Sequence, residues 1–207
     1  GDVYKRQDGD WAKRNGFPGN DPASEWKQVE RDLELVRETG CRYHVCHVST
    51  KESVALIRQA KAEGLPVSCE TGPHYLILCD EDLMDDGRFK MNPPIRSAAD
   101  RDALVEGLLD GTIDCIATDH APHTPQEKAD FRKAPNGSIG METSLAATLT
   151  ALEGVLTLPQ ILEKMSTAPA RILGIPAGTL QVGANADVVL FDPQREWVVD
   201  PEKLHGK

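Results

Sequence analysis

Helical and strand patterns alternate along this chain with only short links between them, and this alternation restricts the fold more than any other feature. The patterns predict helices at residues 22–40, 50–64 and 97–111, and strands at residues 43–48, 66–70, 89–92 and 112–118. Strands that alternate with helices form parallel sheets, because each helix carries the chain back across the sheet. Four such strands make either half of a closed barrel or a small open sheet, and these patterns alone leave both possibilities open.

Both ends of the chain depart from this alternation. Three further helices are predicted at about residues 142–152, 159–165 and 168–173, and Gly174 and Pro176 then mark a break. Beyond the break, residues 187–191 and 197–199 are predicted strands without a helix between them. Residues 1–20 are expected to be irregular and foreign to the fold. The expected division is therefore 1–20, an α/β unit over 21–174, and a separate β unit over 175–207.

Composition excludes several classes of partner. The chain has 207 residues, with 33 acidic and 23 basic side chains and a formal net charge of −10. Without a basic cluster, binding to nucleic acid or to an anionic membrane is not expected. No apolar run approaches the ~20 residues of a membrane helix. The five cysteines include no C-x-x-C pair, which predicts reduced thiols and a cytoplasmic location.

Titratable side chains gather where the predicted strands end. His47, His74, His120 and His123 lie at or just past strand ends, and Asp119 directly follows the strand that ends at Thr118. Parallel α/β folds place their active sites at the carboxyl ends of strands. Imidazole and carboxylate are the ligands of hydrolytic zinc, so two histidines and an aspartate from separate strands predict a zinc site.

His44 and His47 do not form a chelating pair on a strand. Residues three apart on a strand point to opposite faces, so only one of the two can point into the site. His47 lies nearer the carboxyl end of the strand and is the candidate ligand. His44 is expected to face the helices or to support a ligand from behind.

Two loops carry further candidates. Residues 71–75 (TGPHY) contain a Gly-Pro turn that can direct His74 into a cleft. Residues 91–96 (MNPPIR) contain two prolines that stiffen the loop and hold Asn92, whose amide both donates and accepts hydrogen bonds. Either loop is also compatible with an ordinary turn or strand end.

Four motifs together resemble one family. Residues 44–50 (HVCHVST), 70–74 (ETGPH), 90–96 (KMNPPIR) and 116–123 (IATDHAPH) occur in this order and at suitable spacings. As a set they closely resemble the C-terminal half of the bacterial dihydroorotases, in the amidohydrolase superfamily. Residues 140–143 (GMET) resemble the loop after the last metal-bearing strand of that family, and residues 178–192 resemble the return of its chain into a small β-sandwich.

The resemblance implies a fold and a set of site residues. The fold would be about the second half of a (βα)8 TIM-type barrel over 21–174, with part of a small β-sandwich over 175–207. The complete family site holds two zinc ions. By position, His47 and His74 would bind one zinc, and Asp119 would bind the other and act as the general base. The substrate would be held by a separate set of residues: Asn92, His123, Gly140 and Met141. His120 has no ligand role in this mapping.

The chain also departs from the family pattern. The family has a His-x-His pair followed by an arginine on its first strand, and a metal-bridging acidic residue or carboxylated lysine on its fourth. The chain contains no His-x-His sequence. We therefore expect a truncated chain that lacks the N-terminal half and the last sandwich strands, and that binds metal poorly and is inactive alone.

The implied reaction of the intact enzyme is the reversible hydrolysis of dihydroorotate to carbamoyl aspartate, in pyrimidine biosynthesis. One alternative is another cyclic-amide hydrolase, such as an allantoinase or a dihydropyrimidinase. The other is a non-catalytic relative that binds aspartate transcarbamoylase. The partners implied are this small-molecule substrate and either a second copy of the chain or aspartate transcarbamoylase.

Overall fold

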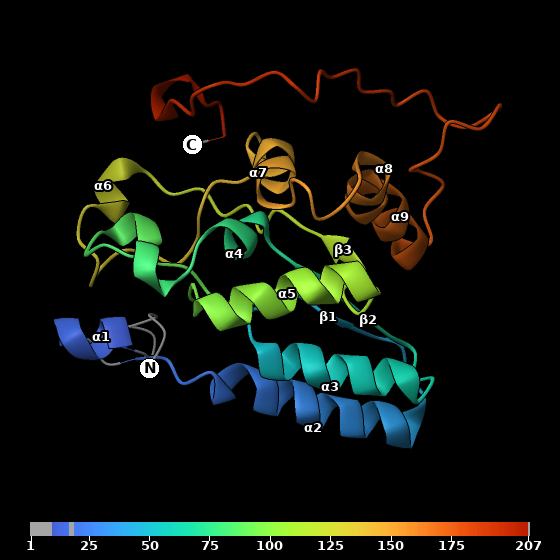
Figure 1. Ribbon diagram of the computed structural model, residues 1–207, viewed down its shortest axis with the longest axis horizontal. Coiled ribbons are helices and arrows are strands. Elements are labelled where there is room, and N and C mark those ends of the chain that lie inside the picture. Colours follow the sequence, from blue (N-terminus) through green and yellow to red (C-terminus); the bar gives the residue numbers. More distant parts are fainter. Residues whose placement is uncertain (1–9, 17–18, 207) are drawn as a thin grey trace.

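The computed structural model describes residues 10–16 and 19–206, which form a parallel sheet covered by helices (Figure 1). The strands are β1 (Tyr43–Val45), β2 (Val67–Thr71) and β3 (Cys115–Ile116). The α-helices are α1 (Asp10–Asn15), α2 (Ala23–Thr39), α3 (Lys51–Ala62), α4 (Pro73–Ile77), α5 (Ala98–Asp110), α6 (Pro125–Lys128), α7 (Ser144–Ala151), α8 (Leu158–Leu162) and α9 (Ala168–Leu173). Short 3-10 helices lie at Asp80–Asp82, Gly87–Phe89 and Pro201–Lys203, and a π-helical turn lies at Glu163–Thr167. None of the helices in these ranges is both long and apolar enough to cross a membrane.

The three strands pair in parallel in the order β1-β2-β3. Val45 lies beside Cys69, and Thr71 lies beside Ile116. Beyond β1, the Val48 amide donates to Glu70 O, and beyond β3, the Ala117 amide donates to Thr71 O. All three strands therefore end at one edge of the sheet, as the predicted βα alternation requires.

Helices cover one face of this sheet. Helix α2 packs on α3, and α3 packs on α5 (Figure 1). The apolar spacing that predicted α2 is the spacing that the core uses, since Val29, Leu33 and Val36 are all buried. Helix α2 ends at Gly40, whose left-handed φ of 69° suits a residue without a side chain. The α/β class with a parallel sheet is thereby confirmed.

Two local predictions in the first half of the chain are wrong. Residues 10–15, expected to be irregular, form helix α1, while residues 1–9 lie outside the described ranges. The strand predicted at 89–92 is absent, and the 3-10 helix Gly87–Phe89 precedes an irregular segment. Lys90 O instead accepts from the Gly137 amide and from Lys128 Nζ, and the prolines at 93 and 94 have no amide hydrogen to donate to a ladder.

The strands predicted at 187–191 and 197–199 are also wrong for this structure. This part of the chain runs past the helices as an extended segment without strand pairing (Figure 1). Val188, Val189, Leu190 and Val198 are largely exposed. A strand is held by hydrogen bonds to a neighbouring strand, and the backbone hydrogen bonds of 181–195 that the structure shows close local turns.

A carboxylate on α2 joins the start of α3 to the loop before α5. Glu25 accepts hydrogen bonds from the Ser49 and Thr50 amides at 3.0 Å each, from both of their hydroxyls and from Ser53 Oγ. Arg96, with only 3% of its side chain exposed, lies 3.7 Å from Glu25 and donates to Ser49 Oγ. The residues just after His47 and just after Asn92 are therefore tied to one buried charge.

Replacement of Glu25 by Ala should lower the free energy of unfolding by about 3–5 kcal/mol, because it leaves Arg96 as an unpaired buried charge. The measurement is urea denaturation followed by circular dichroism. Glu30→Ala, on the exposed side of the same helix, is the matched control and should change stability by no more than about 0.5 kcal/mol. Equal effects of the two substitutions would contradict this role for Glu25.

Candidate active site

The backbone turns sharply where β1 and β3 end, and the turning residues are two of the predicted ligands. Among the described residues, His47 and Asp119 are the two non-glycine residues with positive φ, at 40° and 46°. A left-handed conformation costs an ordinary side chain about 1–2 kcal/mol. Such strain collects at functional sites, where the surrounding structure holds it in place. Both turns lie at the same edge of the sheet.

His74 lies at the same edge, in the first turn of α4 after β2. Its Nε2 is buried and has no hydrogen-bond partner. Burial, with a smaller contribution from His47, lowers the pKa of His74 to about 4. The imidazole is therefore neutral at pH 7, and a neutral imidazole nitrogen is the form that binds metal.

Asp119 lies close enough to neighbouring groups to affect their charge. Its carboxylate contributes to raising the pKa of Tyr75, after the larger effect of burial. Burial, then Glu70 and then Asp119 raise the pKa of Cys46. Tyr75 follows His74 and Cys46 precedes His47, so Asp119 acts electrostatically on the sequence neighbours of both predicted histidine ligands.

Asn92 is exposed and lies in the loop that leads to α5. Tyr75 Oη donates to Pro93 O at 2.7 Å, which ties this loop to the helix that carries His74. Arg96 fixes the other end of the loop through Ser49 and Asn20 O. The loop that carries Asn92 is thus held on both sides of the exposed asparagine by buried neighbours.

Hydrogen bonds to His120 hold the backbone of Gly140 and Met141. The family resemblance gave His120 no role as a metal ligand. The Gly140 amide donates to His120 Nδ1 at 3.1 Å, and the Met141 amide does so at 3.4 Å. His120 Nδ1 is therefore an acceptor, and Nε2 carries the proton. On the other side of this loop, Glu142 Oε1 accepts from the His205 and Gly206 amides at 2.8 Å each.

His123 is fixed by the loop that follows it. Its Nε2 lies 3.0 Å from Asn136 O, and because a carbonyl only accepts, Nε2 carries a hydrogen there. In the neutral ring the remaining nitrogen, Nδ1, is then an acceptor. His123 can donate a second hydrogen bond only as an imidazolium.

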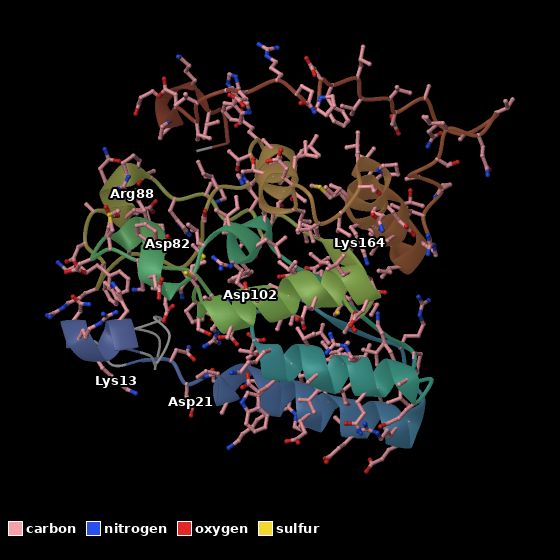
Figure 2. All side chains as sticks on the ribbon, in the orientation of Figure 1. Lys13, Asp21, Asp82, Arg88, Asp102 and Lys164 are labelled. Carbon is pink, nitrogen blue, oxygen red and sulfur yellow. The ribbon has the colours of Figure 1, made fainter. Side chains whose placement is uncertain are left out.

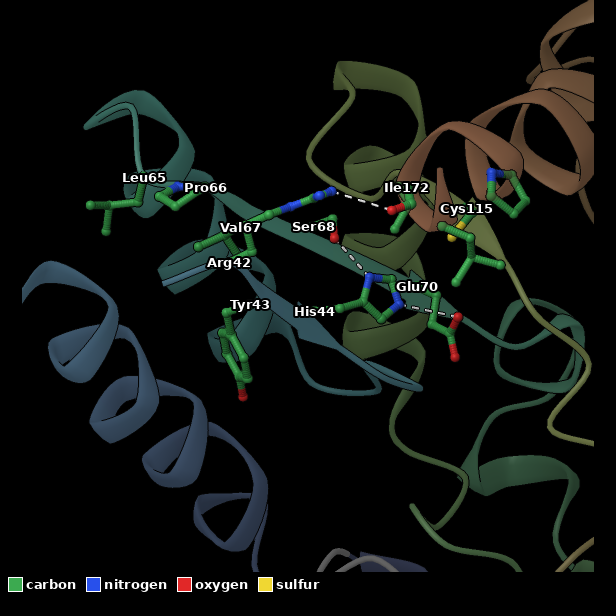
Figure 3. Close-up of a pocket in the computed structure, with 12 residues that line it drawn as sticks. Arg42, Tyr43, His44, Leu65, Pro66, Val67, Ser68, Glu70, Cys115 and Ile172 are labelled. Carbon is green, nitrogen blue, oxygen red and sulfur yellow. Dashed lines mark hydrogen bonds and ion pairs between the residues drawn. The ribbon is translucent and has the colours of Figure 1, made fainter. Parts of the chain in front are cut away.

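The prediction that His44 faces the helices is wrong. In β2 the buried residues alternate with half-buried Ser68 and Glu70, and His44 lies on this second face. His44 Nδ1 is 2.8 Å from Ser68 Oγ, and its Nε2 is 3.3 Å from Glu70 Oε2 (Figure 3). The face of the sheet opposite α2 and α3 is therefore polar where β1 and β2 lie side by side.

The ligand chemistry at the strand ends fits a metal, but the structure does not gather the predicted ligands tightly. His47, His74 and Asp119 provide two imidazole rings and a carboxylate, and His74 Nε2 is a buried polar atom without a partner. Within the described ranges, the group whose ligand atoms all lie within 4.8 Å of one another is His44, Glu70 and Cys115. Three predicted ligands spread over two zinc ions are compatible with the wider spacing.

Several residues that build this edge carried no recognisable signal in the sequence. Glu25 belongs to none of the sequence motifs, and Arg96 appeared only as the last residue of the loop at 91–96. Gly72 appeared only as a turn residue, although a Cβ there would lie 2.6 Å from His74 Cε1. Their roles depend on contacts between distant segments, which residue spacing does not reveal.

Known proteins resemble this chain over most of its length. The model of the Amidohydrolase family matches residues 19–204. Dihydroorotases are 51% identical in Enterococcus faecalis and 49% identical in Geobacillus thermodenitrificans, over 96% and 97% of this chain and 48% of each relative. The chain thus spans about half the length of the curated relatives it matches. The L-hydantoinase (dihydropyrimidinase) structure from Arthrobacter aurescens is 40% identical with a TM-score of 0.71, over 78% of this chain and 38% of that one.

Replacement of Gly72 by Ala should lower the free energy of unfolding by about 1–3 kcal/mol, because the new methyl group overlaps the His74 ring. The backbone at Gly72 has an ordinary φ of −101°, so backbone strain does not contribute to this cost. The measurement is a double-mutant cycle by urea denaturation. In a His74→Ala background the same change should cost no more than about 0.5 kcal/mol. An equal cost in both backgrounds would contradict the contact.

Proposed function

This chain belongs to the amidohydrolase family, and we propose that it carries about half of the active site of a metal-dependent hydrolase that opens the ring of dihydroorotate. The observation that supports the proposal is that His47, His74 and Asp119 follow the three strands at one edge of the sheet, two of them in strained turns and the third with a buried, unpartnered nitrogen. Identities of 49% and 51% to dihydroorotases support the substrate.

His47 and His74 are the proposed ligands of one zinc ion, and Asp119 is the proposed ligand of a second. A bound zinc ion supplies two effects that a cyclic amide needs, since it lowers the pKa of water toward ~7 and polarises a carbonyl group. The strained backbone at His47 and Asp119 fixes where these side chains leave the sheet. Fixed ligands bind a metal without first being ordered.

Asp119 is the proposed general base and acid. Its carboxylate accepts a proton from the attacking water and returns that proton to the ring nitrogen as the amide C–N bond breaks. Proton transfer requires contact within about 3 Å, so the fixed backbone at Asp119 serves this role directly. The products of ring opening are a carboxylate and a ureido group, as in carbamoyl aspartate.

Asn92 and His123 are the proposed contacts to the substrate carboxylate, with the backbone of Gly140 and Met141. Asn92 can donate through its amide from its exposed position. His123 can donate to a carboxylate through Nδ1 only when protonated, because its Nε2 is engaged with Asn136 O. The Gly140 and Met141 amides donate to His120 Nδ1 in this structure. They can donate to the substrate only after these two hydrogen bonds are broken.

We also propose the architecture that the resemblance implies. Residues 21–174 form about the second half of a (βα)8 barrel, and residues 175–207 form part of a small β-sandwich. The exposed valines and leucine of 188–190 support the second assignment, because such a segment is buried when strands pair on both sides of it.

The chain alone should hold metal weakly and show no turnover, since three ligands do not complete two zinc sites. The five unpaired cysteines support a cytoplasmic location. The proposed protein partner is either a second copy of the chain or aspartate transcarbamoylase.

A second cyclic amide is also a candidate substrate. The Arthrobacter aurescens neighbour is an L-hydantoinase (dihydropyrimidinase), at 40% identity. Hydantoin and dihydrouracil rings carry the same cyclic amide without the carboxylate of dihydroorotate. Selectivity for the carboxylate therefore separates the two candidates.

The test joins this chain to the part of the Geobacillus thermodenitrificans relative that it does not match. Turnover is measured on dihydroorotate, dihydrouracil, hydantoin and allantoin, after circular dichroism has shown that each protein is folded. We expect dihydroorotate to be preferred, and Asp119→Asn to reduce turnover about 10²–10⁴-fold. Asp102→Asn, at an exposed position on α5 (Figure 2), is the matched control and should retain activity.

If the joined protein turns over dihydrouracil or hydantoin faster than dihydroorotate, the second candidate substrate replaces dihydroorotate in the proposal. Full activity of the Asp119→Asn protein would refute the assignment of the general base. Stoichiometric zinc and ring opening by the isolated 207-residue chain would contradict the proposal that its ligand set is incomplete.

A further inference from the structure

Two buried lysines lie in the loops beyond the strand ends, and the proposed reaction uses neither of them. Lys90, just before the Pro-Pro loop, is 3% exposed, and Lys128, at the end of α6, is 9% exposed. Lysines are almost never buried to this extent unless they have partners. Contacts among the described residues produce this burial, so it does not depend on any part of the relatives that the chain does not match.

Lys128 joins the segment after α6 to the segment before the Pro-Pro loop, which lies beside α6 (Figure 1). Lys128 Nζ donates to Lys90 O and to Pro135 O, at 2.9 Å each. Lys90 O also accepts from the Gly137 amide at 3.1 Å. One ammonium group and one carbonyl group therefore hold the backbone on both sides of Asn136.

The ammonium group of Lys128 stays charged at pH 7 despite its burial. Burial, with a smaller contribution from Lys90, lowers the pKa of Lys128 to about 8, while Asp86 acts in the opposite direction. Hydrogen bonds from an ionised donor are shorter and stronger than those from a neutral one. Lys128 therefore holds its two carbonyl partners firmly at neutral pH.

The residue held in this way is the partner of a proposed substrate contact. His123 Nε2 donates to Asn136 O at 3.0 Å. The residues after Asn136 pack on the same turn, because a Cβ at Gly137 would lie 3.2 Å from His123 Nε2. The Ala121 amide also donates to Ser138 O at 2.9 Å. A carbonyl fixed at one ring nitrogen sets the orientation and the tautomer of the imidazole.

We propose that Lys128 is a positioning residue for selectivity toward a ring that carries a carboxylate. Lys128 holds the backbone of Asn136, and Asn136 O holds the His123 ring, whose protonated Nδ1 donates to the substrate carboxylate. The inference rests on the proposed function, in which His123 contacts that carboxylate. Lys128 itself contacts no substrate atom. A ring that is not held in advance must be ordered on binding, which weakens the contact.

The first test measures kinetics in the joined protein that tests the proposed function. Lys128→Met removes both hydrogen bonds and keeps an apolar stem. It should lower kcat/KM for dihydroorotate about tenfold, mainly by raising KM, because the carboxylate does not take part in the chemical step. Turnover of dihydrouracil, which has no carboxylate, should change less than about twofold. Lys133→Met, at an exposed lysine of the same segment, is the matched control and should alter neither substrate.

A second readout requires no turnover, so it separates this inference from failure of the proposed function. Nitrogen NMR of the histidine-labelled chain at about pH 7.5, where an ordinary histidine is mostly neutral, shows which ring nitrogen carries the hydrogen. His123 should give two separate signals with the hydrogen on Nε2, and His123→Ala assigns them by their loss. In Lys128→Met the two signals should converge as the tautomers interchange, whereas Lys133→Met should keep them apart.

The proposal is overturned if Lys128→Met impairs both rings equally or leaves dihydroorotate turnover unchanged. If the joined protein turns over neither ring, the proposed function fails, and unchanged His123 signals in Lys128→Met then overturn the positioning role as well. If circular dichroism shows that Lys128→Met does not fold, Lys128→Gln, which keeps a hydrogen-bond donor, takes its place and should show the same changes to a smaller extent. Failure of both variants to fold would make Lys128 a residue of the fold alone and would overturn the proposal.

Discussion

The Glu25 carboxylate accepts hydrogen bonds from two backbone amides and three hydroxyls, and it lies 3.7 Å from the buried guanidinium of Arg96. A buried pair of this kind contributes little net stability, but removal of one member is costly. The main effect of the Glu25–Arg96 pair is to fix positions. The pair joins α2 to the residues after His47 and to the residues after Asn92, so the candidate site at this edge of the sheet has a fixed shape.

The other loops at this edge are also held by buried polar groups. Lys90 Nζ donates to Phe131 O, and Lys128 Nζ donates to Lys90 O and Pro135 O. These bonds fix the segment that presents Asn136 O to His123. His120 similarly fixes Gly140. Loops at a strand edge are mobile unless their backbone groups have partners, and charged side chains provide those partners here.

Residue patterns predicted what depends on neighbours along the chain. Val29, Leu33 and Val36 gave helix α2, and the position of Asp119 after a strand placed it at the functional edge. They failed where distant segments decide the outcome. The strand at 89–92 was lost because Lys90 O bonds to residues 128 and 137, and the strands expected at 187–191 and 197–199 find no partner strand in the part of the chain that the structure describes. Of the two roles expected for His44, the helix-facing one was wrong, because the regular alternation of faces along a strand ends before His47, whose backbone is left-handed.

The pairing of the strands decides which polar side chains reach the edge of the sheet and which stay on its face. Residues that follow the strands, such as His47 and Asp119, leave the sheet through left-handed turns and reach its edge. Residues within the strands, such as His44 and Glu70, lie on the face opposite α2 and α3 and meet their neighbours across the ladder. A shift of one residue in the pairing of β1 with β2 would move His44 away from Ser68 and turn Val45 out of the core. The hydrophobic contacts that hold Val45 and Cys69 beneath the helices therefore also determine which polar side chains meet on the opposite face of the sheet.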